Sequence, residues 1–327
     1  MESVRGVPMT RFRPEERQCI QVHPRHPTVA LLTVMVPVCR LHCIFCTTPQ
    51  GDAVMEPSTL KGSLLALESA RERGLTSLFI TGGEPTELRW LLPLLREARE
   101  MGFGAIRMQS HCGVASDPRG ADALVEAGLT GVDAPLYGSC EAVHEAITRT
   151  RGSWRHTRSG ISELRSRGVE LVVHNTLFRT NLPDLANWRV LVDELAPSGA
   201  YVQLTSAVGP PGVYEDLAPR WEAIARAVAG AFDGWCPSFP FRAADLPECI
   251  APGLSSHLGR AGQVANGDAV VLMPYLDWLD QFLEEGARRF VESCGECSLR
   301  SGCEGVSRES IEILGDVERL QPVRRPA

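Results

Sequence analysis

The sequence predicts an α/β protein in which six strand–helix units form a partly open barrel, followed by a small cysteine-rich extension. Short β-branched runs alternate along the chain with segments whose apolar residues recur at helical spacing. Eleven cysteines are present, with one group near the start of the chain and another near its end. Strands that alternate with helices need crossover connections, and such connections predict a parallel sheet.

The predicted strands are rich in apolar residues and are bounded by turn residues: 29–36, 77–81, 105–109, 131–135, 170–176 and 201–205. A glycine such as Gly102 or Gly128 ends several of the helical runs just before the next strand, which fits a left-handed helix cap. Six units are fewer than the eight of a closed barrel, so we expect a partial (β/α)6, TIM-like barrel with its site at the C-terminal strand ends. The helical periodicity is weakest at Pro93 and over residues 149–158.

The strand–helix alternation stops at about residue 232, where proline, glycine and cysteine begin to interrupt the chain. We therefore predict an N-terminal extension over 1–27, the barrel over 28–232 and a metal-stapled extension over 233–327. The extension contains one amphipathic pattern, which predicts a helix over 275–292.

Composition excludes several classes of protein. The formal net charge of −7 is unlike the basic surface of a general nucleic-acid-binding protein. No apolar run is long enough to span a membrane, and the N-terminal residues lack the apolar core of a signal peptide. These features predict a cytoplasmic protein without nucleic-acid or membrane partners. In a reducing compartment, clustered cysteines indicate metal ligands rather than disulfides.

The first cysteine group, Cys39, Cys43 and Cys46, directly follows the first predicted strand. Three thiolates can ligate three irons of a [4Fe–4S] cluster and leave the fourth iron open to a reactant. A zinc loop and three unrelated buried cysteines are the alternatives. His42 lies between two of the cysteines, where packing or a bond to a carbonyl is the simpler role.

Two motifs resemble the radical S-adenosylmethionine (SAM) superfamily. The first group has the spacing CxxxCxφC with the aromatic Phe45, and the second predicted strand ends in Gly82-Gly83-Glu84-Pro85, which is similar to the family's GGEP motif. The resemblance implies that a [4Fe–4S] cluster with an open iron binds SAM. The cluster then cleaves SAM reductively to a 5′-deoxyadenosyl radical that abstracts hydrogen. Paired glycines let a ligand approach the backbone, and Glu84 either neutralises the SAM ammonium or braces the turn.

The resemblance places further SAM contacts at later strand ends. The residues that match are Phe45, Gly82, Gly83, Glu84, Pro85, Gln109, Ser110, Asn175 and Thr205. Four of these residues are equally explained as turn formers at strand ends: Gln109, Ser110, Asn175 and Thr205. The fourth strand departs from the family pattern, because Ala134 and Pro135 stand where relatives carry a serine. Asp133 is the substitute that we consider for the ribose contact.

The second cysteine group, Cys294, Cys297 and Cys303, has two and then five intervening residues. It resembles the core of the SPASM and Twitch auxiliary-cluster extensions, which implies one auxiliary [4Fe–4S] cluster. Ser307 stands where the full SPASM pattern has another cysteine, so two extra clusters are not expected. Cys249 is the predicted fourth ligand and Cys236 the alternative; a structural zinc site is the rival interpretation. Four cysteines would close the cluster, whereas three would leave an iron for substrate.

The resemblance implies an oxidoreductase that matures ribosomal peptides by crosslink formation or side-chain oxidation. The alternatives are a small-molecule enzyme of cofactor or natural-product biosynthesis and a non-catalytic iron–sulfur or zinc scaffold. An electron donor such as flavodoxin or ferredoxin is implied. Only about 28 residues precede the first strand, so we expect a leader peptide to need either a separate binding protein or the barrel surface. Candidate hydrogen or proton donors lie near strand ends: Cys112, Cys140, His111, His174 and Tyr137.

Overall fold

The structure is a computed structural model that describes residues 20–22, 29–34, 36, 38–46, 57–205, 213–244, 246–254, 288–301, 303, 305–307, 310–315 and 317–324. Eight strands form one sheet whose spatial order follows the sequence. β1 is antiparallel to β2, and each later strand is parallel to its predecessor. The strands are β1 (Ile20–Val22), β2 (Val29–Val34), β3 (Ser77–Gly82), β4 (Ala105–Gln109), β5 (Gly131–Pro135), β6 (Glu170–Leu177), β7 (Gly199–Leu204) and β8 (Phe241–Ala244).

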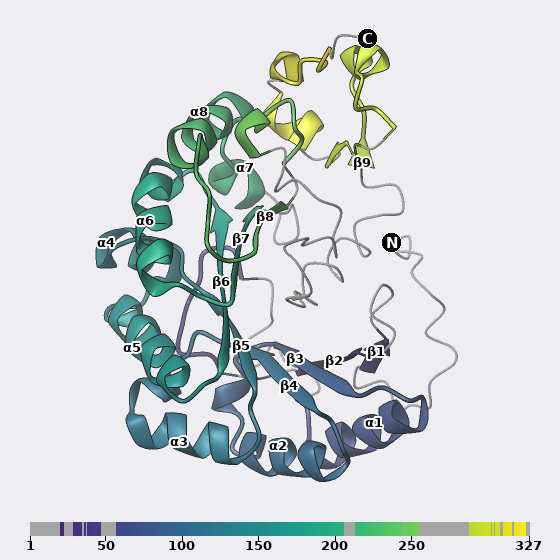
Figure 1. Cartoon of the computed structure of the whole chain (residues 1–327), viewed down its shortest axis with the longest axis vertical. Coiled ribbons are helices and arrows are strands. Elements are labelled where there is room, and N and C mark those ends of the chain that lie inside the picture. Colours follow the sequence, from purple (N-terminus) through teal and green to yellow (C-terminus); the bar gives the residue numbers. More distant parts are fainter. Residues whose placement is uncertain are drawn as a thin grey trace.

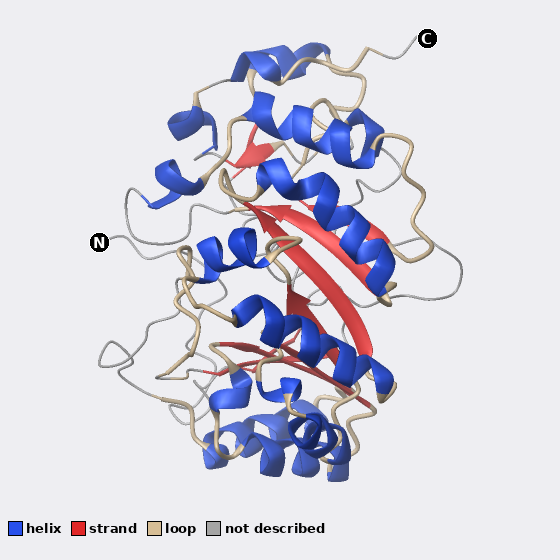
Figure 2. Ribbon diagram, turned by 90° about the vertical axis from the view of Figure 1, so that its left-hand side faces the viewer, coloured by secondary structure: helices blue, strands red, loops and turns tan. Residues whose placement is uncertain are grey.

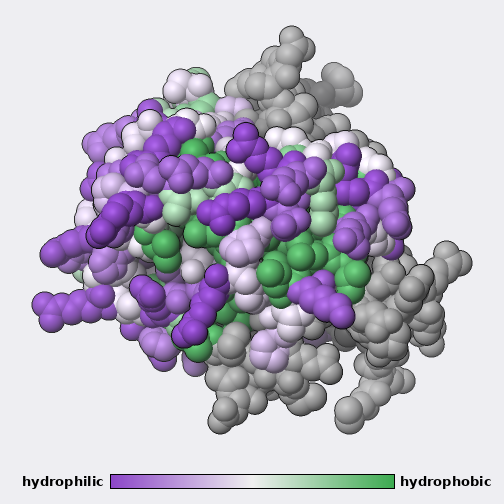
Figure 3. Space-filling model, turned by 90° about the horizontal axis from the view of Figure 1, so that it is seen from below, coloured by the Kyte–Doolittle hydropathy of each residue, from purple (hydrophilic) through white to green (hydrophobic). Residues whose placement is uncertain are grey.

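Helices cover the convex side of this curved sheet (Figures 1 and 2). They are α1 (Leu60–Glu72), α2 (Leu91–Glu100), α3 (Pro118–Glu126), α4 (Glu141–Thr148), α5 (Ser153–Ser166), α6 (Leu185–Leu195), α7 (Val213–Leu217) and α8 (Trp221–Phe232). Seen from below, the face around α1, α2 and α3 is mostly hydrophilic with hydrophobic side chains between the polar ones (Figure 3). None of the described helices is long and apolar enough to cross a membrane. The predicted α/β class and the partial barrel are confirmed.

The sheet is larger than the sequence predicts, because it has seven parallel strands rather than six. β8 lies beyond the predicted barrel end at residue 232, and β1 lies within the predicted extension 1–27. β8 has only four residues, Phe-Arg-Ala-Ala, so its apolar pattern is too short to detect. Pro93 is tolerated because it occupies the first turn of α2, where a missing N–H leaves no helical hydrogen bond unmade.

The predicted helix over 275–292 falls mostly on residues 275–287, which lie outside the described residues. The described part is not helical at its start, because Arg288–Arg289 form strand β9, which pairs with β10 (Val306–Ser307). The following residues, Glu292–Glu296, form a short 3₁₀ helix. This extension packs on α8, since Arg319 forms an ion pair with Glu222.

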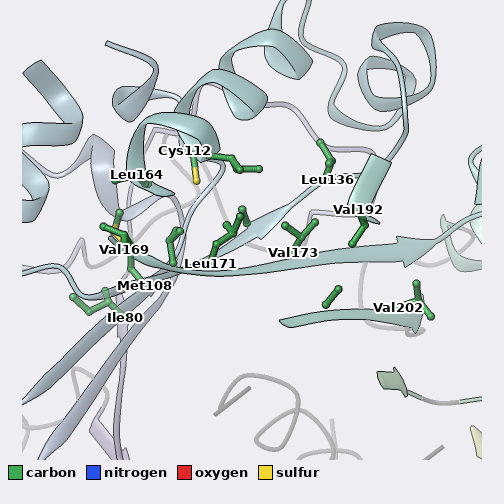
Figure 4. Packing of buried hydrophobic residues seen from close by; sticks show 14 of the residues in the cluster. Ile80, Met108, Cys112, Leu136, Leu164, Val169, Leu171, Val173, Val192 and Val202 are labelled. Atoms are coloured by element: carbon green, nitrogen blue, oxygen red, sulfur yellow. The ribbon is translucent and has the colours of Figure 1, made fainter. Parts of the chain in front are cut away.

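Strand alternation divides the side chains into two sets. One set, including Ile80, Met108 and Val173, packs against the helices in the main hydrophobic core (Figure 4). Alternate residues such as Phe79 and Arg107 belong to the opposite, concave face, where Phe79 packs in a separate cluster with residues of β2. Unlike the helix side, this inner face carries many polar side chains, which suits it to ligand binding.

Candidate functional site

The first cysteine loop is held by two backbone hydrogen bonds to the C-terminal end of α4. The His42 amide donates to Thr148 O at 2.9 Å, and the Ile44 amide donates to Ile147 O at 3.0 Å. The Phe45 ring stacks on Phe178 with centroids 4.9 Å apart. Two amides and one aromatic anchor therefore fix the loop that carries Cys39, Cys43 and Cys46.

The three thiols of this loop lie near one another. Burial raises the pKa of Cys43 to about 12, and the neighbouring Cys46 and Cys39 raise it further in the same direction. Burial likewise raises the pKa of Cys39 to about 11, while Cys46 is exposed. Metal ligation removes such protons, because the thiolate is the ligand.

Three thiols are a donor set that an iron–sulfur cluster can take. Among the residues that the structure describes, no three cysteine, histidine, aspartate or glutamate side chains converge closely enough to enclose one metal ion. A [4Fe–4S] cube binds each thiolate on a different iron, so its ligands stand farther apart than the ligands of one ion. Three neighbouring thiols on one loop are consistent with that wider arrangement.

The paired glycines lie where β3 passes the chain that enters the cysteine loop. Gly82 has φ +116°, and a Cβ there would stand 2.2 Å from Val34 O; a Cβ on Gly83 would stand 2.9 Å from the Val36 Cβ. The Gly83 amide donates to Val34 O at 3.0 Å. The glycines thus bring the end of β3 directly against the start of the cysteine loop.

We expect Gly82→Ala to destabilise the fold by about 2–4 kcal/mol, because the new Cβ meets backbone and the φ angle is strained for alanine. Urea unfolding of the purified protein measures this loss. Gly104→Ala is the control, since a Cβ at Gly104 meets nothing within 4 Å. Equal unfolding midpoints for the two variants would contradict the close approach.

Glu84 is a buried carboxylate, 4% exposed, and it organises the turn after β3. Its Oε1 accepts hydrogen bonds from the Thr86 amide at 3.1 Å, the Thr86 hydroxyl at 2.6 Å and the Ser110 hydroxyl at 2.7 Å. Its Oε2 accepts the His111 amide at 2.9 Å, and His111 Nε2 lies 3.3 Å away. Glu84 therefore joins the ends of β3 and β4 and braces the turn, as the sequence allowed.

The other predicted SAM contacts divide into two groups. Gln109 and Ser110 lie beside the glycine turn: Gln109 Oε1 accepts the Thr81 hydroxyl at 2.8 Å, and Ser110 donates to Glu84. Asn175 lies within β6, two residues before its end, and its Oδ1 accepts a hydrogen bond from the Asn181 side chain at 2.9 Å, while Thr205 follows β7. Their contacts with SAM stay predictions.

Asp133 is fully buried on β5, level with Gln109 on β4. Its Oδ1 accepts Arg107 Nη2 at 2.8 Å, and Arg107 also forms an ion pair with Glu170. Burial raises the pKa of Asp133, although Arg107 acts in the opposite direction. Its second oxygen, Oδ2, has no hydrogen-bond partner among the described residues. Asp133 is thus committed to Arg107 through one oxygen, and its contact with the ribose of SAM stays a prediction.

Further polar residues lie on the inner face of the later strands. The His174 ring stacks on Tyr201 with centroids 4.9 Å apart and planes at 6°, and Tyr201 pairs in register with Arg242 on β8. The Gln203 amide donates to the Thr176 hydroxyl at 3.1 Å. Four polar residues of this face were not predicted from the sequence: Arg107, Tyr201, Gln203 and Arg242. The first three occupy alternate, inward-facing positions on strands that the sequence did predict, and this alternation was the signal for them; Arg242 lies on β8, which was not predicted.

The second cysteine group lies together with Cys249. Burial raises the pKa of Cys249 to about 12, and the thiols of Cys303, Cys294 and Cys297 raise it further. Cys236 is exposed and does not contribute to this shift. The Gly305 amide donates to Cys303 Sγ at 3.3 Å. The arrangement brings four thiols of the extension into one neighbourhood.

Comparison with known proteins identifies the family. The model of the radical SAM superfamily matches residues 33–187. The chain contains a radical SAM domain. The match spans the cysteine loop, the Gly82–Glu84 turn and the strand ends through Asn175. Thr205 and the second cysteine group lie beyond it.

Relatives with assigned names include both peptide-modifying and small-molecule enzymes. PqqA peptide cyclase of Ruegeria pomeroyi is 26% identical over 330 residues, which cover 90% of this chain and 86% of the relative. GTP 3′,8-cyclase of Petrotoga mobilis is 31% identical over 150 residues, 45% of this chain and 46% of the relative. The structure of Streptococcus suis SuiB bound to precursor peptide SuiA is similar in fold, with a TM-score of 0.57 at 15% identity over 89% of this chain and 73% of SuiB.

The candidate hydrogen or proton donors of this radical SAM chain differ in their surroundings. Cys112 lies among the hydrophobic side chains on the helix side of the sheet, where burial raises its pKa well above the usual value (Figure 4). Tyr137 packs against Phe45, and His111 pairs with Glu84, so both lie beside the cysteine loop or its neighbouring turn. Cys140 is exposed. His174 is buried on the concave side, where burial lowers its pKa to about 3, so its ring is neutral.

Proposed function

We propose that this radical SAM enzyme binds its catalytic cluster at Cys39, Cys43 and Cys46 and acts on a peptide. When bound, such a cluster and SAM supply the 5′-deoxyadenosyl radical that abstracts hydrogen from the substrate. The proposal for the ligands is supported by the neighbouring thiols on a loop that α4 and Phe178 hold in place. The other residues that we assign to the site act by the way they surround this loop.

The residues around the loop would position SAM rather than react with it. Because Gly82 and Gly83 carry no Cβ, the end of β3 packs directly against Val34 and Val36, and this sets the backbone of the glycine turn beside the cysteine loop, where SAM would bind. Glu84 keeps the ends of β3 and β4 together, and so holds Gln109 and Ser110 beside the glycine turn. The half-buried ring of Phe45 packs against Tyr137 and Phe178 and so keeps water from that side of the cysteine loop.

We also propose one auxiliary [4Fe–4S] cluster held by Cys249, Cys294, Cys297 and Cys303. The mutual effect of these thiols on the pKa of Cys249 supports Cys249 over Cys236 as the fourth ligand. The amide-to-sulfur hydrogen bond at Cys303 supports the same site, because such bonds stabilise a thiolate.

Replacing Cys249 with alanine is expected to lower the iron content of the anaerobically reconstituted protein from about eight to about four atoms per chain. Cys236→Ala removes the rival ligand and is the matched control, with iron unchanged. Iron and sulfide counting measures both variants. Loss of iron in Cys236→Ala alone would assign the fourth ligand to Cys236, and bound zinc in the wild type would support the zinc interpretation instead.

A peptide is the proposed substrate, and the observation that carries this choice is the match to PqqA peptide cyclase along nearly the full length of both chains. SuiB, whose fold is similar, was solved with a precursor peptide. A separate leader-peptide-binding protein and an electron donor such as flavodoxin or ferredoxin are further proposed partners. The expected chemistry is crosslink formation or side-chain oxidation, both of which remove hydrogen from the peptide.

Co-expression with short peptides encoded beside the gene of this protein tests the substrate class. Mass spectrometry should find one peptide lighter by the mass of two hydrogen atoms, and tandem spectra should locate the new bond. The alternative is a small-molecule substrate, which the local similarity to GTP 3′,8-cyclase favours. Substrate-dependent formation of 5′-deoxyadenosine with a nucleotide, and with none of the peptides, would select that alternative.

A further inference from the structure

A basic segment runs from the end of α4 through the turn and into α5. Residues 146–162 contain no acidic side chain, although the chain as a whole has a formal net charge of −7. The segment holds four arginines and one histidine: Arg149, Arg151, Arg155, His156 and Arg158. A local positive surface on an acidic protein needs a physical reason, because scattered charges of both signs would serve solubility equally well.

Two of these arginines are free to meet a partner. Arg149 and Arg151 are exposed, and their side chains form no hydrogen bond or ion pair with any residue that the structure describes. Arg155, by contrast, pairs with Glu141, and the Arg158 guanidinium lies 4.9 Å from the centroid of the Trp154 ring. We call Arg149 and Arg151 the basic turn.

The basic turn lies directly beside the first cysteine loop. The two backbone hydrogen bonds from His42 and Ile44 end on Thr148 and Ile147, the last residues of α4 before Arg149. The Thr150 hydroxyl, between the two arginines, donates to Arg40 O at 3.3 Å. Within the loop, His42 and Cys46 are exposed. The positive charges therefore adjoin the surface through which the loop is reached from solvent.

We propose that the basic turn is the docking surface for a small acidic carrier protein that delivers one electron to the cluster at Cys39, Cys43 and Cys46. This inference rests on the proposed function, which requires a reductant. One electron leaves the carrier and enters the cluster, and no covalent bond or proton changes hands. The rate of electron transfer between proteins falls steeply with the distance between the donor and the acceptor. A carrier must therefore dock beside the loop that holds the cluster.

The charge of the basic turn favours an acidic carrier protein over other partners. An acidic protein would be repelled by most of a chain of net charge −7 and attracted at the basic turn, which fixes its orientation as well as its encounter rate. Arg149 has φ +50° and caps the C-terminal end of α4, where a positive side chain is also favourable to the helix dipole. The backbone therefore holds this charge at a defined point beside the loop.

Stopped-flow reduction of the reconstituted cluster by flavodoxin hydroquinone tests the docking surface without SAM or substrate. We expect Arg149→Glu/Arg151→Glu to lower the second-order rate constant of reduction by flavodoxin about ten-fold at low ionic strength. As the salt concentration rises to about 0.3 M, the difference between the wild-type and variant rate constants should largely disappear. Reduction by dithionite, which needs no docking, should be unchanged. Arg96→Glu/Arg99→Glu, at two exposed positions on α2, changes the net charge equally and should behave as wild type.

Three results would overturn the proposal. They are a wild-type flavodoxin rate that does not respond to salt, equal flavodoxin rates for the two double variants, and weakened binding of a substrate peptide with an unchanged flavodoxin rate. The milder Arg149→Gln/Arg151→Gln variant, with its iron content measured, repeats the comparison if charge reversal disturbs the loop. Failure of the proposed function is seen separately, as a cluster that dithionite reduces but that does not cleave SAM.

Discussion

Alanine in place of Cys39, Cys43 or Cys46 is expected to abolish the cleavage of SAM. Each substitution leaves two of the three thiolates that the cluster needs, and a cluster with too few ligands is lost rather than merely weakened. Iron should fall by about four atoms per chain, while the auxiliary site keeps its share. The product, 5′-deoxyadenosine, is quantified by chromatography of anaerobic reactions that contain dithionite.

Cys140→Ala is the matched control for this prediction. Cys140 is an exposed thiol at the start of α4 and belongs to neither cysteine group. It should retain wild-type iron and wild-type SAM cleavage. If one of the three loop variants retains both, that cysteine is not a ligand. If Cys140→Ala loses them, the loop assignment is wrong.

The second large effect is expected at Glu84. In Glu84→Ala, the Ser110 hydroxyl and the His111 and Thr86 amides lose their acceptor. Because buried donors without partners are unfavourable, we expect the free energy of unfolding to fall by about 3 kcal/mol. SAM cleavage should fall at least about a hundred-fold, because the ends of β3 and β4 no longer hold Gln109 and Ser110 beside the glycine turn.

Glu84→Gln separates shape from charge in this network. The glutamine fits the space but presents an amide donor to groups that are themselves donors, so we expect most of the loss seen with alanine. Glu68→Gln, at an exposed position on α1, is the control and should change neither stability nor activity. Urea unfolding and SAM cleavage are measured for all three variants. A Glu84→Gln protein as stable and as active as wild type would contradict the bracing role.

The sequence predicted the elements whose signals are local. The strands that begin at Val29, Ser77, Ala105 and Gly131 form where their apolar runs predict them, because a buried parallel strand must be apolar over most of its length. The spacing of Cys39, Cys43 and Cys46 placed the loop at the C-terminal end of β2. β8 was missed, because a four-residue strand is defined by its neighbour β7 rather than by its own pattern.

The candidate site was predicted less completely, because its contacts join distant segments. Sequence shows that Gly82 and Glu84 follow a strand, but the close approach of Gly82 to Val34 and the bond from Ser110 to Glu84 depend on the register of the sheet. The pairing of Arg107 with Asp133 and Glu170 depends on it too, since these residues lie on three strands. A proline-rich turn such as that around Cys249 gives no sign of its distance from Cys294.

Cleavage of SAM by the wild-type protein tests the central claim most directly. The anaerobically reconstituted protein, with its iron and sulfide counted, is reduced by dithionite and supplied with SAM, and 5′-deoxyadenosine is followed over time. The account predicts that wild-type protein forms this product and that a variant with Cys39, Cys43 and Cys46 all replaced by alanine forms none. Wild-type protein that holds a reduced [4Fe–4S] cluster and yet leaves SAM intact would contradict it.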